Sequence, residues 1–242
     1  MTENEIAEMA KSKVFATAQR PADSATLIIV RRDGGRHRIL LGQRSHHHEF
    51  MPGKYVFPGG RYDADDGKME PVGALQLHVL DKLLVKMRGR PSISRARGLA
   101  LAAVRETFEE VGLIIGKPAT GHRAPNADWQ LFIDAGHAPD LSGLVFFARA
   151  ITPPGRTRRF DSRFFVVDAD HVANLDAPHH AGTGELLTPH WFTYAETRSL
   201  DLPIITNDIL TRLNTILEAG TWPTGPVCFQ YQVNGKWREE TL

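Results

Sequence analysis

Cysteine is almost absent from this chain of 242 residues, in which Cys228 is the only one. A single cysteine cannot form an intrachain disulfide, and the sequence has neither a CxxC pair nor a thiol cluster that would hold zinc. The chain is therefore expected to work in a reducing compartment and to fold by burying its apolar residues, which make up 42% of the sequence.

An excess of charge of one sign is also missing. Lys and Arg number 29 against 28 Asp and Glu, so the formal net charge of +1 gives no general attraction to nucleic acid or to an anionic membrane. No run approaches the ~20 apolar residues of a spanning helix, and residues 1–20 lack the apolar core of a signal peptide. These absences predict a cytoplasmic protein whose partner is a small molecule, with neither a nucleic acid nor a membrane.

Strand and helix patterns alternate along the chain. Apolar runs at 25–30 and 39–41 flank Asp33-Gly34-Gly35, which predicts a β-hairpin, and further strands are expected at 113–115, 144–150 and 163–167. Amphipathic spacing predicts one helix within 67–98, a second at 94–112 and a third at about 207–219. Without a repeat or a low-complexity linker, the pattern favours one α/β domain spanning 1–242.

The helix expected at 94–112 places carboxylates opposite an apolar stripe. The stripe consists of Leu101, Val104, Phe108 and Val111. Glu106, Glu109 and Glu110 lie on nearly the opposite side, where their like charges repel and Arg105 is the only obvious compensation. Such a face is either simply solvated or a platform for Mg²⁺, which commonly bridges carboxylates to substrate phosphates.

Residues 105–113 read Arg-Glu-Thr-Phe-Glu-Glu-Val-Gly-Leu, and Phe57-Pro58-Gly59-Gly60 stands upstream. Together they resemble the signature of the Nudix hydrolase family, and the resemblance extends over residues 25–191. Two departures are present: Asp66 stands where the first glutamate of the signature is expected, and the spacing is longer by roughly the length of segment 67–98. A surface loop accommodates such a helical insertion at small entropic cost.

The resemblance implies a fold, a cofactor and a set of roles. The fold is an α/β/α sandwich with a mixed β-sheet and an inserted helical segment, and the cofactor is Mg²⁺ or Mn²⁺. The metal ligands are expected to be Glu106, Glu109, Glu110 and Gly60. Glu106 is also expected to act as ligand or base, and Arg105 to orient the glutamates through a salt bridge. Glu185 is a candidate for a further catalytic carboxylate, although a loop glutamate is usually solvated.

The substrate expected from the resemblance is a nucleotide derivative that contains a diphosphate. Residues 40–45, 50–53 and 159–165 are similar to segments of coenzyme A diphosphatases, including a peroxisomal subgroup. Coenzyme A or acyl-CoA, split into 4′-phosphopantetheine and adenosine 3′,5′-bisphosphate, is therefore the favoured substrate. The alternatives are hydrolysis of ADP-ribose or another nucleoside diphosphate derivative, and a non-catalytic Nudix-fold module that binds a ligand.

Several residues outside the carboxylate helix are expected to contact this substrate. The candidates are Arg44, Gly59, Gly60, Lys82 and Lys86. The two lysines are included because the insertion is connected to both the glycine turn and the carboxylate helix, whereas the alternative is a helix that only covers the core or forms a homodimer. Arg158, Arg159 and Arg163 either contact phosphate or structure their own loop, and the run His46-His47-His48 is a weaker candidate for a transition-metal site because no fourth ligand is evident.

Overall fold

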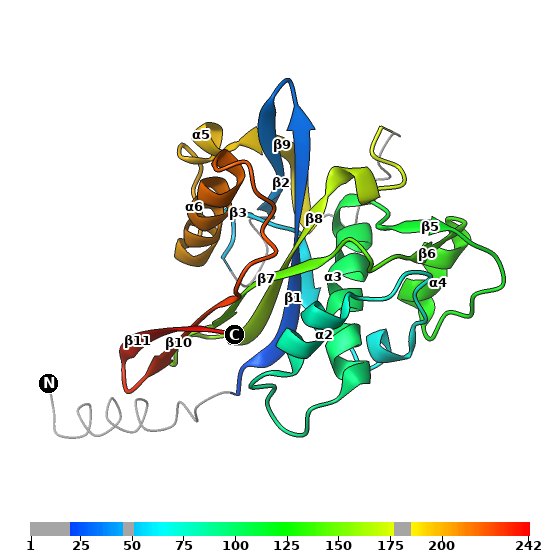
Figure 1. The fold of residues 1–242 in the computed structure, drawn as a ribbon, viewed down its shortest axis with the longest axis horizontal. Coiled ribbons are helices and arrows are strands. Elements are labelled where there is room, and N and C mark those ends of the chain that lie inside the picture. The colour runs from blue at the N-terminus through cyan, green and yellow to red at the C-terminus, as the bar shows by residue number, and fades with distance from the viewer. Residues whose placement is uncertain (1–19, 46–50, 177–184) are drawn as a thin grey trace, which may run out of the picture.

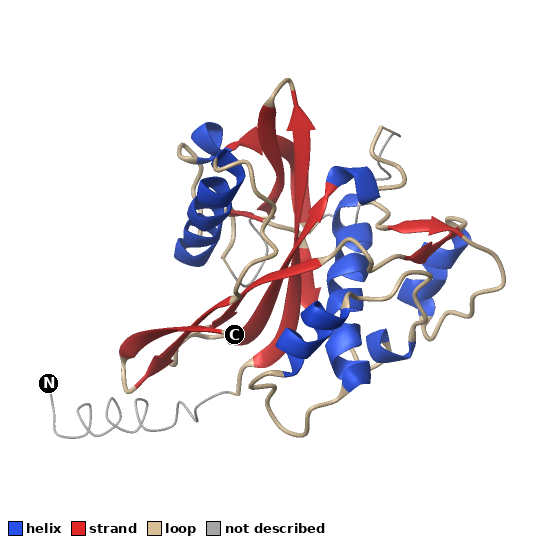
Figure 2. Cartoon of the chain, in the orientation of Figure 1, coloured by secondary structure: helices blue, strands red, loops and turns tan. Residues whose placement is uncertain are grey.

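The computed structural model describes residues 20–45, 51–176 and 185–242. Within these ranges nine strands form one twisted sheet (Figures 1 and 2). The spatial order is β11 (Lys236–Thr241), β10 (Cys228–Val233), β7 (Val145–Ile151), β8 (Phe160–Asp168), β1 (Ala22–Asp33), β2 (Arg36–Arg44) and β3 (Tyr55–Val56). In addition β4 (Gly59–Arg61) pairs with β1, and β9 (Leu186–Thr193) pairs with β2. The sheet is mixed, because β1 runs parallel to β8 and β7 parallel to β10 whereas the other pairs are antiparallel.

Helices cover both faces of this sheet (Figure 1). On one face lie α2 (Leu77–Leu84), α3 (Ile93–Val111) and α4 (Ala127–Asp134), beside a small sheet of β5 (Gly116–Pro118) and β6 (His137–Pro139). On the other face lie α5 (Tyr194–Thr197) and α6 (Ile204–Glu218). Short 3-10 turns occur at η1 (Asp66–Lys68) and η2 (Ala169–His171). This arrangement confirms the expected α/β fold with a mixed sheet between helices.

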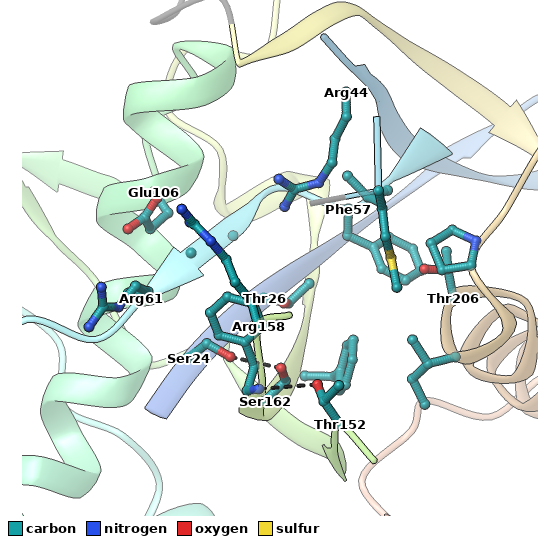
Figure 3. Close-up of a pocket in the computed structure, with 18 of the residues that line it drawn as sticks. Ser24, Thr26, Arg44, Phe57, Arg61, Glu106, Thr152, Arg158, Ser162 and Thr206 are labelled. Atoms are coloured by element: carbon teal, nitrogen blue, oxygen red, sulfur yellow. Dashed lines mark hydrogen bonds between the residues drawn. The ribbon is translucent and has the colours of Figure 1, made fainter. Parts of the chain in front are cut away.

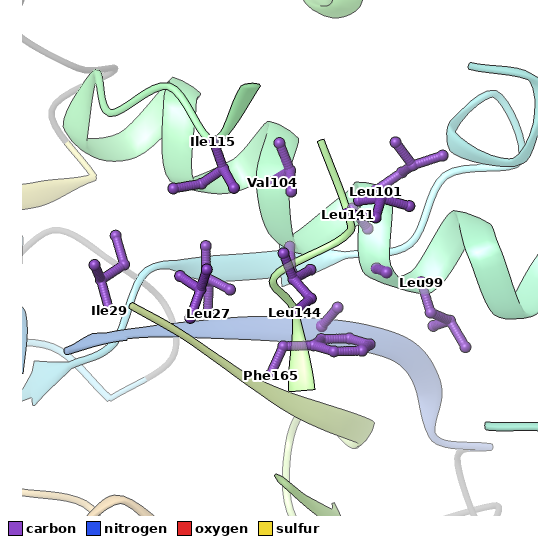
Figure 4. Close-up of a cluster of buried hydrophobic side chains, with 14 of the residues drawn as sticks. Leu27, Ile29, Leu99, Leu101, Val104, Ile115, Leu141, Leu144 and Phe165 are labelled. Carbon is purple, nitrogen blue, oxygen red and sulfur yellow. The ribbon is translucent and has the colours of Figure 1, made fainter. Parts of the chain in front are cut away.

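Strand β1 contributes to two separate cores because its side chains alternate between the faces of the sheet. Leu27 and Ile29 belong to the core under α3, where they lie opposite Leu101 and Val104 (Figure 4). Ile28 and Val30 belong to the core under α6, which also contains Ile209, Leu210 and Leu213. Burial on both faces explains why residues 25–30 are continuously apolar.

The ends of α3 agree with the sequence. The hydroxyl of Ser92 accepts a hydrogen bond from the backbone N–H of Arg95 at 3.3 Å, which caps the first turn. Gly112 ends the helix with a φ of 71°, a left-handed conformation that glycine adopts at little cost. Between these ends the helix is buried on more sides than the apolar stripe indicated, because Thr107 and Glu110 are buried as well.

The segment 67–98 covers the core. Its ordered helix, α2, is shorter than the periodicity predicted, and the last six residues of the segment already belong to α3. The apolar positions of the segment are nevertheless buried as expected: Leu75, Val79, Leu83 and Met87. A guanidinium joins the end of α2 to the sheet, because Arg149 donates to the carbonyl of Lys86 at 3.1 Å while it pairs in a bidentate manner with buried Asp161.

Several strands differ from the expectation. Residues 113–115 form no strand beyond an isolated bridge from Ile115 to Val172. Strand β9 is not among the strands that the sequence patterns predict. Four of the eight β9 residues are exposed, and β11 is rich in charged side chains, so neither strand shows the alternation of a half-buried strand. None of the helices in the described part of the chain combines the length and the apolar character needed to cross a bilayer.

Candidate active site

Two glycines bring β4 against α3. Gly59 has a φ of 153°, and a Cβ at this position would lie 2.5 Å from the carbonyl oxygen of Ala25 on β1. At Gly60 a Cβ would collide with the carboxylate of Glu106. Both positions therefore require glycine for close packing, and the turn reaches the carboxylates of α3 only because no side chain intervenes.

Glu106 and Glu110 face this turn. The backbone N–H of Gly59 donates to Oε2 of Glu110 at 2.8 Å, and the Glu110 side chain is buried, in contrast to the expectation of an open carboxylate face. Burial is the main reason that the pKa of Glu110 rises to about 8, against the opposing effect of the Gly59 hydrogen bond. Burial likewise raises the pKa of Glu106 to about 7, because its 3.0 Å ion pair with Arg105 only partly offsets desolvation.

Arg105 is fixed by carboxylates on two sides. Its Nη1 lies 2.9 Å from Oε1 of Glu109, and its Nε donates to Oδ1 of Asp66 at 2.8 Å. Burial lowers the pKa of Arg105, but the hydrogen bond to Asp66 and the neighbouring carboxylates outweigh burial and raise it. The expected salt bridge between Arg105 and the glutamates is therefore present, and the arginine is held in its charged form.

Asp66 is buried and accepts several hydrogen bonds at once. Besides Arg105, the indole Nε1–H of Trp129 donates to Oδ1 at 3.0 Å, and the backbone N–H of Asp63 donates to Oδ2 at 2.8 Å. Asp66 thus faces Arg105, not the open end of the carboxylate face. The sequence did not point to Trp129, because it lies on α4 far from the signature.

A cavity of about 360 Å³ opens beside Glu106 and the glycine turn (Figure 3). Six candidates from the sequence line it: Arg44, Gly59, Gly60, Glu106, Arg158 and Glu185. The remainder come from β1, β3, β4, β8, the start of α6 and residues beside β3 and after β7: Ser24, Thr26, Met51, Val56, Phe57, Arg61, Thr152, Phe160, Ser162, Phe164, Pro203, Ile205 and Thr206. No motif marks most of these, since they meet only when the sheet assembles.

Glu185 stands at the start of β9, where its carbonyl accepts a hydrogen bond from the backbone N–H of Ser45 at 3.0 Å. The charge of Glu185 raises the pKa of Glu110, although this effect is smaller than those of burial, Gly59, Glu106 and Arg44. The structure therefore brings Glu185 and Arg44 to the same end of the cavity as the α3 carboxylates.

No family model matches the chain. Its sequence is 28% identical over 176 residues to the human acyl-coenzyme A diphosphatase NUDT19, covering 53% of this chain and 47% of the human protein. The chicken acyl-coenzyme A diphosphatase NUDT19 is also 28% identical, over 180 residues that cover 54% of this chain and 48% of the relative. The chain thus matches about half the length of these relatives.

A solved structure matches over most of the chain. The NUDIX hydrolase from Alicyclobacillus acidocaldarius superposes with a TM-score of 0.62 at 24% identity, over 86% of this chain and 99% of that structure. The chain has the Nudix fold. Residues 105–113, which resemble part of the Nudix signature, lie on α3 and in the loop that follows it in this fold.

Some expected residues lie away from the cavity of this Nudix fold. Lys82 donates to the carbonyl of Gly225 at 2.7 Å, and Lys86 pairs with Glu240, so both contact the C-terminal part of the chain and neither lines the cavity. The positions of these lysines give no support to a substrate-binding role.

The arginines of the β8 region separate into different roles. Arg158 lines the cavity, whereas buried Arg163 on β8 donates to Asp23 at 2.6 Å and joins two strands. Nε of Arg159 donates to the carbonyl of Thr152 at 3.0 Å, within its own loop. His46, His47 and His48 lie outside the described residues.

The carboxylates of α3 suit a hard divalent cation. Among the described residues no three His, Cys, Asp or Glu side chains converge as a ready metal centre, since Glu106 and Glu109 both pair with Arg105. Burial raises the pKa of both Glu106 and Glu110, and Glu106 raises that of Glu110 further. A bound cation would stabilise the ionised form of both carboxylates and reduce their repulsion. The ligands that these two side chains offer are carboxylate oxygens, which Mg²⁺ and Mn²⁺ prefer.

Proposed function

We propose that this chain is a divalent-metal-dependent diphosphatase that hydrolyses coenzyme A and acyl-CoA to 4′-phosphopantetheine, or its acyl derivative, and adenosine 3′,5′-bisphosphate. The observation that carries the proposal is the contact of Glu106 and Glu110 with the Gly59-Gly60 turn at one end of a cavity. The similarity to acyl-coenzyme A diphosphatases supports the choice of substrate.

In this proposal Glu106, Glu109, Glu110 and the carbonyl of Gly60 hold Mg²⁺ or Mn²⁺. The bound cation supplies positive charge that activates water and neutralises the diphosphate oxygens. Arg105 keeps its charge and, anchored by Asp66, holds Glu109 and Glu106 on the side of the helix that faces the turn. Gly59 and Gly60 have no side chains, so the diphosphate can approach the carboxylates past this turn.

The remaining charged groups of the cavity have separate tasks in the proposal. Water adds to one phosphorus atom, the P–O–P bridge breaks, and a carboxylate takes the proton from the water. Glu106 lines the cavity and has a pKa near neutrality, which suits a general base, and Glu185 is the second candidate for that role. Arg44, Arg61 and Arg158 border the same end and would bind the phosphate oxygens (Figure 3).

A substrate panel tests this function. Purified protein with Mg²⁺ is incubated separately with coenzyme A, lauroyl-CoA, ADP-ribose, a dinucleotide and a nucleoside triphosphate, and the products are identified by mass. The proposal predicts the highest kcat/KM for the coenzyme A substrates, with adenosine 3′,5′-bisphosphate as the shared product. A preference for ADP-ribose would keep the hydrolase but overturn the substrate, and ligand binding without turnover would indicate a non-catalytic module.

A further inference from the structure

The cavity changes in character from one end to the other. Glu106 and Arg61 lie at the charged end, and Phe57 and Thr206 lie across from them, beside α6 (Figure 3). The wall near α6 is apolar, because Phe57 and Phe164 belong to the core under α6, and Pro203 and Ile205 stand at the start of that helix. A diphosphate and its cation match the charged end, so the opposite end receives the organic part of the substrate.

Hydroxyl groups connect the two ends along the floor of the cavity. Ser24 on β1 and Ser162 on β8 are register partners, and their Oγ atoms are 2.7 Å apart. Thr26 continues the row on β1, and Thr152 follows β7. Such hydroxyls donate to and accept from amide groups, which the pantetheine arm carries between its diphosphate and its thiol.

The first turn of α6 carries one isoleucine that lines the cavity and one that is exposed. Ile205 lines the cavity at the first turn of α6, and the adjacent Ile204 is 87% exposed. An isolated exposed isoleucine is ordinary, but this one is the chain neighbour of a residue that lines the cavity. An alkyl chain longer than the cavity would extend past Ile204, whereas a nucleobase is compact and would end within the cavity.

The polar groups of this end also discriminate between the two arms of coenzyme A. Of the described residues that line the cavity, none has an amide or imidazole side chain that would pair with the edge of an adenine. An alkyl chain requires no such partner and gains free energy from apolar contact alone.

We propose that the α6 end of the cavity, with Ile205 on its wall and Ile204 at its rim, binds the alkyl chain of an acyl thioester. The inference rests on the proposed function. The diphosphate then lies beside Glu106, the pantetheine arm crosses the hydroxyls of β1 and β8, and the acyl chain leaves past the start of α6. This wall lies on the face of the sheet opposite to the insertion, so the acyl preference is set by α6 and not by the segment 67–98.

The experiment compares lauroyl-CoA with acetyl-CoA in Ile205→Trp, which fills the α6 end, and in Ile204→Asp, which places a charge on the rim. In both variants the ratio of kcat/KM for lauroyl-CoA to that for acetyl-CoA is expected to fall by about tenfold or more, the scale of several lost apolar contacts. Ile204→Asp changes an exposed side chain, so it tests the proposal even if Ile205→Trp fails to fold. Leu131→Trp is the matched control, since Leu131 on α4 is 60% exposed and remote from the cavity lining.

An unchanged ratio in the folded variants would overturn the proposal. Equal losses with lauroyl-CoA, acetyl-CoA and free coenzyme A would overturn it as well, and an equal loss with ADP-ribose would assign this end to the adenine. Failure of the proposed function is seen separately, because the wild-type protein would then hydrolyse none of the coenzyme A substrates.

Discussion

Glu110 is a deeply buried carboxyl group, and the backbone N–H of Gly59 donates a hydrogen bond to it. We expect Glu110→Gln to lower kcat by roughly two orders of magnitude or more, the scale for loss of an essential catalytic group. Glutamine retains an acceptor for Gly59 and cannot ionise, and burial disfavours the ionised form of Glu110, so folding is expected to survive although the site is buried. Steady-state kinetics and thermal unfolding check both parts, and a near-wild-type kcat would remove Glu110 from the catalytic centre.

Trp129 acts on the same site through Asp66 and Arg105. Trp129→Phe keeps an aromatic ring in the core but removes the N–H that donates to Asp66, so Arg105 is expected to hold Glu106 and Glu109 less rigidly. A hydrogen bond to a charged group contributes about 1.5–3 kcal/mol, so a fall in kcat of about tenfold is expected, with KM little changed. Phe132→Leu is the control, since Phe132 packs against Trp129 through its ring alone. A similar fall in kcat in that variant would indicate that Trp129 contributes through packing and not through its hydrogen bond to Asp66.

At the scale of elements, α3 carries Glu106 and Glu110, whose folded pKa values of about 7 and about 8 exceed the ordinary glutamate value of 4.5. The folded state therefore binds more protons than the unfolded chain, and its stability falls as pH rises through this range. Without metal, the Tm is expected to decrease between about pH 5 and about pH 8.5, and Mg²⁺ should reduce that decrease because a cation favours the ionised carboxylates. Thermal scans with and without Mg²⁺ test this, with the double variant Glu106→Gln and Glu110→Gln as the control that flattens the curve. A metal-free Tm that rises over this interval would contradict the account.

The insertion offers a prediction of its own. Because Lys82 and Lys86 contact Gly225 and Glu240, replacing both with Ala should leave KM for coenzyme A within about twofold of wild type, since exposed ion pairs add little. Arg44→Ala is the matched comparison, because it also removes a positive charge, but from a residue that lines the cavity. A selective rise in KM for coenzyme A in the lysine variant would return the insertion to substrate recognition.

These elements also show what the sequence could predict. The β1–β2 hairpin, the limits of α3 and its carboxylates follow from local patterns, namely a turn, a cap and a spacing. Trp129 and the hydroxyls of the cavity floor could not be found in this way, since Ser24 and Ser162 meet only through the parallel pairing of β1 with β8. Glu110 was assigned to an exposed face because a helical wheel cannot include the glycine turn that packs over it.

For the whole molecule, one sheet with a separate core on each face positions the site at the edge of β4, between α3 and α6. The two sides contribute differently: α3 supplies carboxylates, and α6 with β8 supplies the wall for the organic part of the substrate. A single domain over 1–242 and a homodimer stay predictions, which limited proteolysis and size-exclusion chromatography with light scattering would test.

The most direct test of the account is the release of adenosine 3′,5′-bisphosphate from coenzyme A as the Mg²⁺ concentration is varied. The account predicts that release requires Mg²⁺ or Mn²⁺, stops in excess EDTA and returns when the metal is restored, because the proposed ligands are oxygen donors. Full activity in excess EDTA, in a protein shown to be free of bound metal, would contradict it.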